Sequence, residues 1–173
     1  MTYIISDTHF LHKNIIKFTN RPQNHNQLMI ENWNNIVKPD DTVIHLGDVS
    51  CGLKLYENGQ ELIEKIISSL NGTKILIKGN HDYKPNQYYI DLGFESVQDY
   101  IIVDKVLLCH YPLEIGQYDN EYQKEIEQLQ KIAEENAIEE VWHGHSHTKH
   151  YTSTKIPHRN FAVELNNYTP VLV

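Results

Sequence analysis

The sequence predicts an α/β fold. Short apolar runs alternate along the 173 residues with longer segments whose apolar residues recur every three or four positions. This alternation is typical of proteins that pack helices against a sheet. In addition, the same polar residue types, Asp, Asn and His, follow one apolar run after another. Ligands of open α/β sheets bind beyond the carboxyl ends of the strands, so these side chains are expected to meet at one edge.

The apolar runs are the expected strands, because they are short and bounded by polar or glycine residues. They cover Tyr3–Ser6, Thr42–Leu46, Lys74–Lys78, Tyr100–Val103, Lys105–Cys109, Glu139–Trp142 and Phe161–Glu164. Between these runs, apolar residues spaced along one helical face predict helices. The expected helices lie around Met29–Val37, Leu62–Leu70 and Tyr122–Ala133.

The composition is that of a globular protein, and the length fits a single domain over residues 1–173. No apolar run approaches the ~18 residues that a membrane span requires, and we expect a cytoplasmic protein without a membrane partner. The formal net charge of −8 argues against an extended nucleic-acid partner, because such proteins present basic surfaces to the phosphates. Oligomeric state is not predicted by any of these features.

The polar residues that follow the strands form a candidate metal site. They are Asp7 and His9, Asp48, Asn80 to Asp82, His110, and the pair His145 and His147. Carboxylate, amide and imidazole groups together suit manganese, iron, nickel, cobalt or zinc. One ion cannot use so many ligands, whereas two ions roughly 3.5–4 Å apart and bridged by a carboxylate can. We therefore expect two divalent ions, with manganese as the first choice.

These motifs resemble those of the calcineurin-like metallophosphoesterases. The family pattern of D-x-H, GD, GNH with an acidic residue, a lone H, and GHxH appears here, in order, as DTH, GD, GNHD, the H of CHYP, and GHSH. The resemblance implies two stacked mixed β-sheets flanked by helices. It also implies that one metal is held by Asp7, His9, Asp48 and His147. The second metal would be held by Asp48, Asn80, His110 and His145, with Asp48 as the bridge.

The same resemblance implies hydrolysis of small phosphomonoesters or phosphodiesters, nucleotide-derived esters among them. A hydroxide bridging the two metals would attack phosphorus, and His81 would be the general acid that protonates the leaving oxygen. A nuclease or a pyrophosphohydrolase could use the same site. A non-catalytic binding module is the alternative outside enzymes, although here every ligand position is filled.

Several residues depart from the family pattern or allow two interpretations. Cys51 stands where many members have an aspartate that orients the histidine acid, and the sequence leaves open what orients His81 instead. Gly52 replaces the arginine of the protein phosphatases, which disfavours that activity. His12 and Arg21 are candidates for contacts with the substrate phosphate, with an exposed surface position as the alternative for each.

The run from Val141 to His150 contains four histidines, of which His145 and His147 have the spacing of ligands to adjacent ions. His143 shares this alternation but lies on the strand side of Gly144. We expect His143 to support or pack against the site, and His150 to lie outside it.

Overall fold

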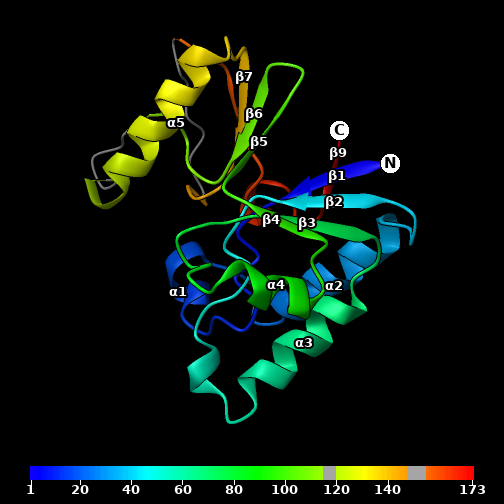
Figure 1. Ribbon diagram of the computed structural model, residues 1–173. Helices are drawn as coiled ribbons and strands as arrows, with labels where there is room; N and C mark the ends of the chain where they lie inside the picture. Colours follow the sequence, from blue (N-terminus) through cyan, green and yellow to red (C-terminus); the bar gives the residue numbers. More distant parts are fainter. Residues whose placement is uncertain (115–119, 148–154) are drawn as a thin grey trace.

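The computed structural model describes residues 1–114, 120–147 and 155–173, and within them two stacked sheets with helices on both outer faces (Figure 1). His150 lies outside the described residues. The first sheet has the strand order β4-β3-β2-β1-β9, and the second has the order β5-β6-β7-β8. Each sheet combines parallel and antiparallel pairs. The predicted fold of two stacked mixed sheets flanked by helices is therefore confirmed.

The first sheet consists of β1 (Thr2–Ile5), β2 (Thr42–His45), β3 (Thr73–Ile77), β4 (Ser96–Gln98) and β9 (Val171–Leu172). The second consists of β5 (Tyr100–Val103), β6 (Val106–Cys109), β7 (Glu140–His143) and β8 (His158–Asn160). The helices are α1 (Ile15–Thr19), α2 (His25–Ile36), α3 (Gly59–Ser69), α4 (Asn86–Leu92) and α5 (Gln123–Glu135). Three short 3-10 helices are η1 (Leu53–Leu55), η2 (Asn120–Tyr122) and η3 (Val163–Leu165).

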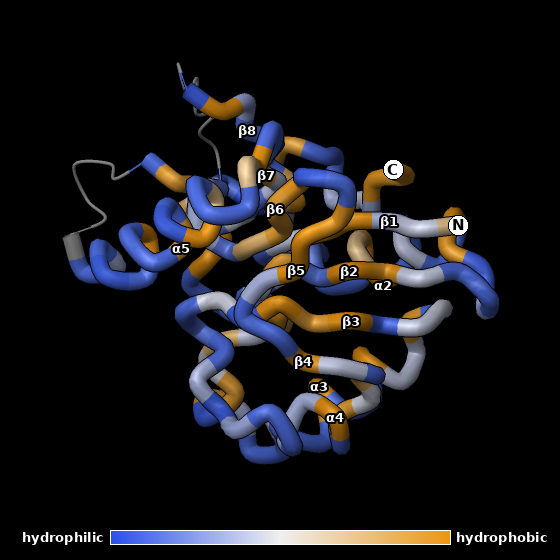
Figure 2. The backbone as a smooth tube through the Cα atoms, turned by 45° about the horizontal axis from the view of Figure 1, so that its top comes forward, coloured by the Kyte–Doolittle hydropathy of each residue, from blue (hydrophilic) through white to orange (hydrophobic). Residues whose placement is uncertain are grey.

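Alternating side chains of the strands supply separate layers of the core, because successive residues of a strand point to opposite faces. In β1, Tyr3 and Ile5 pack in the layer between the first sheet and its helices, whereas Ile4 packs in the layer between the sheets. In β6, Leu107 faces the layer beneath α5 and Leu108 faces the first sheet. The strands are therefore hydrophobic along most of their length, as Figure 2 shows for β2, β3 and β5.

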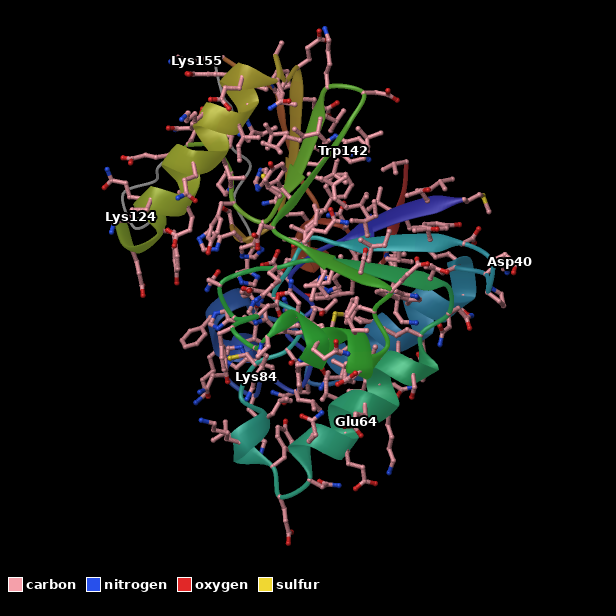
Figure 3. The ribbon with its side chains drawn as sticks, in the orientation of Figure 1. Asp40, Glu64, Lys84, Lys124, Trp142 and Lys155 are labelled. Carbon is pink, nitrogen blue, oxygen red and sulfur yellow. The ribbon has the colours of Figure 1, made fainter. Side chains whose placement is uncertain are left out.

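The layer between the sheets also holds aromatic side chains. Trp142 of β7 extends toward the first sheet (Figure 3), and its ring centroid lies 5.4 Å from that of Phe161. This contact ties the second sheet to the segment that returns toward β1. No helix in the described part of the chain is long and apolar enough to cross a membrane.

One predicted strand is wrong, and several short elements were not predicted. Residues Phe161–Glu164 do not form a strand, because the chain turns after β8 and enters η3. The segment keeps one isolated parallel bridge, in which the N–H of Ser6 donates to the carbonyl of Phe161 at 3.0 Å and the N–H of Val163 donates to the carbonyl of Ser6 at 3.2 Å. The N–H of Ala162 instead donates to Oδ1 of Asn160 at 2.9 Å. Phe161 and Val163 are buried although the pairing does not extend into a strand. The elements absent from the prediction are β4, β8, β9, α1 and α4.

Substitution of Trp33 tests how much the core between α2 and the first sheet contributes to stability. It is 1% exposed, and its Nε1–H donates to the carbonyl of Asn71 at 2.9 Å. We expect Trp33→Ala to lower the free energy of unfolding by about 3–5 kcal/mol, because it leaves a large cavity. Urea unfolding followed by circular dichroism measures this. The control Val103→Ala, at a position 51% exposed, should change it by less than about 0.5 kcal/mol, and equal unfolding midpoints for the two variants would contradict the prediction.

Candidate metal centre

The seven predicted metal ligands come together where five strands end. Asp7 and His9 follow β1, Asp48 follows β2, and Asn80 follows β3 in the first sheet. From the second sheet, His110 follows β6, and His145 and His147 follow β7. The stacking of the sheets is thus what brings the two halves of the ligand set together.

Asp48 lies between two groups of candidate ligands. Its Oδ2 is 3.3 Å from Nε2 of His9 and 3.6 Å from Nε2 of His110. Potential ligand atoms of Asp7, His9 and His147 lie within 4.8 Å of one another, and so do those of Asp7, Asp48 and His110. A single carboxylate oxygen close to both groups has the position that a bridging ligand requires.

Asn80 joins two of the histidines. Its Oδ1 lies 3.0 Å from Nε2 of His110 and 3.1 Å from Nδ1 of His145. The amide orientation is set on its other side, because Nδ2 donates to the hydroxyl of Tyr122 at 3.2 Å. Three potential ligand atoms therefore point to a common position.

The backbone is strained at the ligands. Asp7, His9, Asp48 and His145 all have positive φ, between 44° and 64°. Residues with a Cβ rarely adopt this region, and each such residue costs of order 1–3 kcal/mol, which the surrounding structure must offset. The conformation aims the His145 N–H at both carboxylate oxygens of Asp7, at 3.0 and 3.1 Å. Strain of this kind is characteristic of sites that are preorganised for a ligand.

Two glycines allow the turns to approach one another. A Cβ on Gly79 would lie 2.3 Å from Oδ1 of Asp48 and 2.8 Å from Cε1 of His110. A Cβ on Gly144 would lie 2.3 Å from Oδ2 of Asp7. These distances are shorter than any van der Waals contact, so both positions require glycine.

The electrostatics of these residues fit divalent cations. Both ring nitrogens of His9 are buried without a hydrogen-bond partner, and burial lowers the pKa of its imidazole, which favours the neutral, metal-binding form. Burial by itself would raise the pKa of Asp48, but the nearby His110 and His9 hold it below its usual range. An imidazole of this kind beside buried, ionised carboxylates suits divalent metal ions.

Glu164, which was not among the predicted site residues, supports the site. Its Oε1 lies 3.0 Å from Nδ1 of His147, which leaves Nε2 of that histidine for a metal. Burial opposes protonation of His147, but the hydrogen bond and charge of Glu164 raise its pKa overall. A carboxylate within the apolar stretch FAVEL was the one feature of the sequence that could have pointed to it.

Arg21 has a different role from the one predicted. Its side chain is fully buried and forms an ion pair with Glu164 at 2.7 Å. The guanidinium also donates to the carbonyl oxygens of Asp7 at 2.6 Å and Thr8 at 2.7 Å. Because these contacts occupy the guanidinium inside the protein, the predicted contact with a substrate phosphate is replaced by a structural one. Arg21 holds the DTH turn and Glu164 in place.

Asp82 links two turns of the site and does not orient His81. Its carboxylate accepts hydrogen bonds from the backbone N–H groups of Gly79, Asp48 and Val49, at 2.9, 2.6 and 3.2 Å. Burial, followed by the nearby charge of Asp48, raises the pKa of Asp82 to about 7.

Cys51 is the residue that reaches His81. Its Sγ lies 3.7 Å from Nδ1 of the imidazole, while the backbone N–H of His81 donates to Oδ1 of Asp48 at 2.8 Å. Burial and the charge of Asp48 raise the pKa of the thiol, so the group that faces His81 is neutral. The side chain of His81 is 41% exposed, at the open edge of the site.

His12 lies at the same edge, whereas His143 does not. The ring of His12 is 5.4 Å from that of His9 and 6.5 Å from that of His81. Burial, and then the neighbouring His9 and His81, lower the pKa of His12 to about 4. His143 is fully buried and its ring lies 5.5 Å from that of His158, in keeping with a packing role.

Known proteins with related sequences match most of this chain. The model of the calcineurin-like phosphoesterase superfamily domain matches residues 1–161. An uncharacterised protein of Methanocaldococcus jannaschii, MJ1445, is 33% identical over 98% of this chain and 85% of its own length. The gene 66 protein of Mycobacterium phage L5 is 37% identical over 47% of this chain and 39% of its own length.

Solved structures agree with the sequence relatives. The protein of unknown function AQ665 from Aquifex aeolicus superposes with a TM-score of 0.83 at 30% identity, covering 99% of this chain and 94% of that one. The nuclease MPE of Pseudomonas putida has a TM-score of 0.53 at 17% identity, covering 84% and 61%, and shares the fold. By its ordered motifs, its two-sheet fold and the match over residues 1–161, this chain belongs to the calcineurin-like phosphoesterase superfamily.

Proposed function

We propose that this protein hydrolyses phosphomonoesters or phosphodiesters with two divalent metal ions, manganese being the first candidate and iron, nickel, cobalt or zinc the alternatives. The observation that carries the proposal is the position of Asp48 Oδ2 between His9 and His110, each of which belongs to a different group of ligands. Small esters, nucleotide-derived ones among them, are the proposed substrates. The superfamily supports hydrolysis of phosphoesters in general.

The proposed ligand sets are those named from the motifs. Asp7, His9, Asp48 and His147 would hold one ion, and Asp48 with Asn80, His110 and His145 would hold the other. When bound, such a pair of ions lowers the pKa of a water and neutralises charge on the phosphoryl group. The strained turns and the hydrogen bonds of Arg21, Glu164 and Asp82 keep the ligands in place before the ions arrive.

His81 is the proposed general acid. Its Nδ1 faces the thiol of Cys51, so Nε2 is the ring nitrogen available to protonate the leaving oxygen. Nε2 lies 4.0 Å from Oδ2 of Asp48, at the exposed edge of the ligand cluster. No side chain of the chain needs to form a covalent intermediate, because the attacking oxygen comes from water.

The proposal is tested by a matrix of metals and substrates. Protein stripped with EDTA is supplied with manganese, nickel, iron, zinc or magnesium and assayed on p-nitrophenyl phosphate and bis(p-nitrophenyl) phosphate. We expect no turnover without metal and full recovery with at least one of the ions, with two ions bound per chain. Absence of turnover with every metal on both substrates would overturn the proposal.

Replacement of His81 tests the general acid. We expect His81→Ala to bind two metals as tightly as the parent, but to lose about 10²–10⁴-fold in kcat on esters with poor leaving groups, such as alkyl phosphates. Esters of p-nitrophenol should lose far less, since that leaving group departs without a proton. A loss of the same size on both kinds of ester would show that His81 has another role.

Substitution of Glu164 tests whether its carboxylate supports His147 as a metal ligand. We expect Glu164→Gln to lower metal affinity by about 10–100-fold, because His147 loses the carboxylate that sets its tautomer. Isothermal titration of the stripped protein measures this, and excess metal should restore activity. The control Glu139→Gln removes a carboxylate with a 70% exposed side chain and should change nothing, so an unchanged affinity in Glu164→Gln as well would contradict the proposed support.

A further inference from the structure

Three segments beside His81 form an exposed surface that the metal centre does not use. They are residues 12–18, 51–57 and 81–84, which contain His12, Cys51 and His81 at their inner ends. We name their outer side chains the rim surface. The rim surface consists of Lys13, Lys17, Phe18, Lys54, Leu55, Tyr83 and Lys84, all of them exposed.

The apolar members of the rim surface are unusually exposed. Phe18, Tyr83 and Leu55 are 74%, 71% and 58% exposed. Apart from Met1, they are the most exposed large hydrophobic side chains in the described part of the chain. Single exposed apolar residues are ordinary, but three of them around one site indicate a binding surface.

Neighbouring rings and segments place these side chains beside the candidate metal centre. The ring of Phe18 lies 6.4 Å from that of His12, which in turn lies 6.5 Å from that of His81. A Cβ on Gly52 would lie 3.4 Å from Leu55 and 4.0 Å from His12, so Leu55 approaches the same histidine. Tyr83 follows His81 by two residues, and the rim surface therefore borders the general acid.

The charge of the rim surface is opposite to that of the whole protein. The three segments contain four lysines, with Glu57 and the buried Asp82 as their only acidic residues, whereas the chain as a whole has a formal net charge of −8. Two of the lysines lie near aromatic rings: Lys84 Nζ is 5.6 Å from the ring centroid of Tyr83, and Lys13 Nζ is 4.4 Å from that of Tyr56. Figures 1 and 3 show α1 and Lys84 on the side of the strands' carboxyl ends and Asp40 at the opposite edge of the sheet.

We propose that the rim surface binds single-stranded nucleic acid, so that the nucleotide leaving on the His81 side is held by Phe18, Tyr83 and the lysines. This inference rests on the proposed function and names its substrate class. The net charge of −8 argued against an extended nucleic-acid partner, whereas the local group of four lysines supports binding of a short single strand. Exposed aromatic rings stack on bases regardless of sequence, and interspersed lysines neutralise the phosphates between them. A duplex presents its bases only at its ends, so stacking on both rings requires an unpaired strand. Four lysines also exceed what one phosphate group can use.

The test is binding of a 5′-fluorescein-labelled 12-nucleotide oligo(dT), measured by anisotropy in EDTA so that no hydrolysis occurs. We expect Phe18→Ala/Tyr83→Ala to weaken binding about tenfold or more, because the stacking of a base on each ring is lost. Lys13→Ala/Lys84→Ala should also weaken it. The loss of these two lysines should also make the slope of log affinity against log salt shallower by about 1.4, since each phosphate contact on a single strand contributes about 0.7.

Matched controls lie on other faces of the molecule. Lys65→Ala/Lys131→Ala removes two exposed lysines from α3 and α5, and Val103→Ala/Leu172→Ala removes two exposed apolar side chains. Both pairs should bind the oligonucleotide as the parent does. Equal affinity of the rim variants and the parent would overturn the proposal, and so would displacement of the label by a 12-base-pair duplex as readily as by the single strand.

The inference can fail independently of the proposed function. The phosphoesterase proposal fails if neither p-nitrophenyl phosphate nor bis(p-nitrophenyl) phosphate is turned over with any metal, whereas binding in EDTA requires no metal. In the active enzyme, the rim variants should raise the KM for the oligonucleotide more than the KM for bis(p-nitrophenyl) phosphate. Equal changes in the two KM values would contradict a role of the rim surface in recognising the strand.

Discussion

The geometry of the candidate metal centre depends on a reciprocal pair of hydrogen bonds between the turns that follow β2 and β3. Oδ1 of Asp48 accepts the backbone N–H of His81 at 2.8 Å, and Oδ2 of Asp82 accepts the backbone N–H of Asp48 at 2.6 Å. The turns can approach this closely only because Gly79 has no Cβ. Displacing either turn would move Asp48, the proposed bridging ligand, and His81, the proposed general acid, together, since both are held by the same contacts.

This arrangement is costly for the apoprotein. Asp7, Asp48 and Asp82 are all buried, and the charge of Asp48 contributes to the raised pKa of Asp82. Four ligand residues also have positive φ. Buried like charges and strained backbone are tolerated where surrounding contacts offset them, and here the ion pair of Arg21 with Glu164 and its bonds to the DTH turn supply such contacts. Divalent ions would add the missing positive charge, which explains why the protein keeps a costly arrangement at this place.

The open side of the site has a different character from its buried side. Around the candidate ligands, hydrogen bonds of Asp48, Asp82, Arg21 and Glu164 hold the turns in place. Beyond His81, the chain presents a thiol, a half-buried His12 and then exposed aromatic and basic side chains. In the proposed function, the phosphoryl group and the rest of the substrate would be recognised by separate segments, so the leaving-group side could change without loss of the candidate ligands.

The α/β class and the candidate ligands could be predicted from the sequence, because both depend on local patterns: apolar runs of strand length, and Asp, Asn or His placed directly after them. The same local pattern was wrong for Phe161–Glu164, where the pairing is a single bridge between Ala162 and Ser6 and the chain then enters η3. The roles of Arg21, Glu164, Asp82 and Cys51 follow from contacts that exist only in the folded chain. Arg21 and Glu164 are 143 residues apart in the chain, and the contact between Cys51 and His81 joins two separate turns. Such contacts arise from the stacking of the two sheets and the meeting of their turns, and no spacing within one segment can encode them.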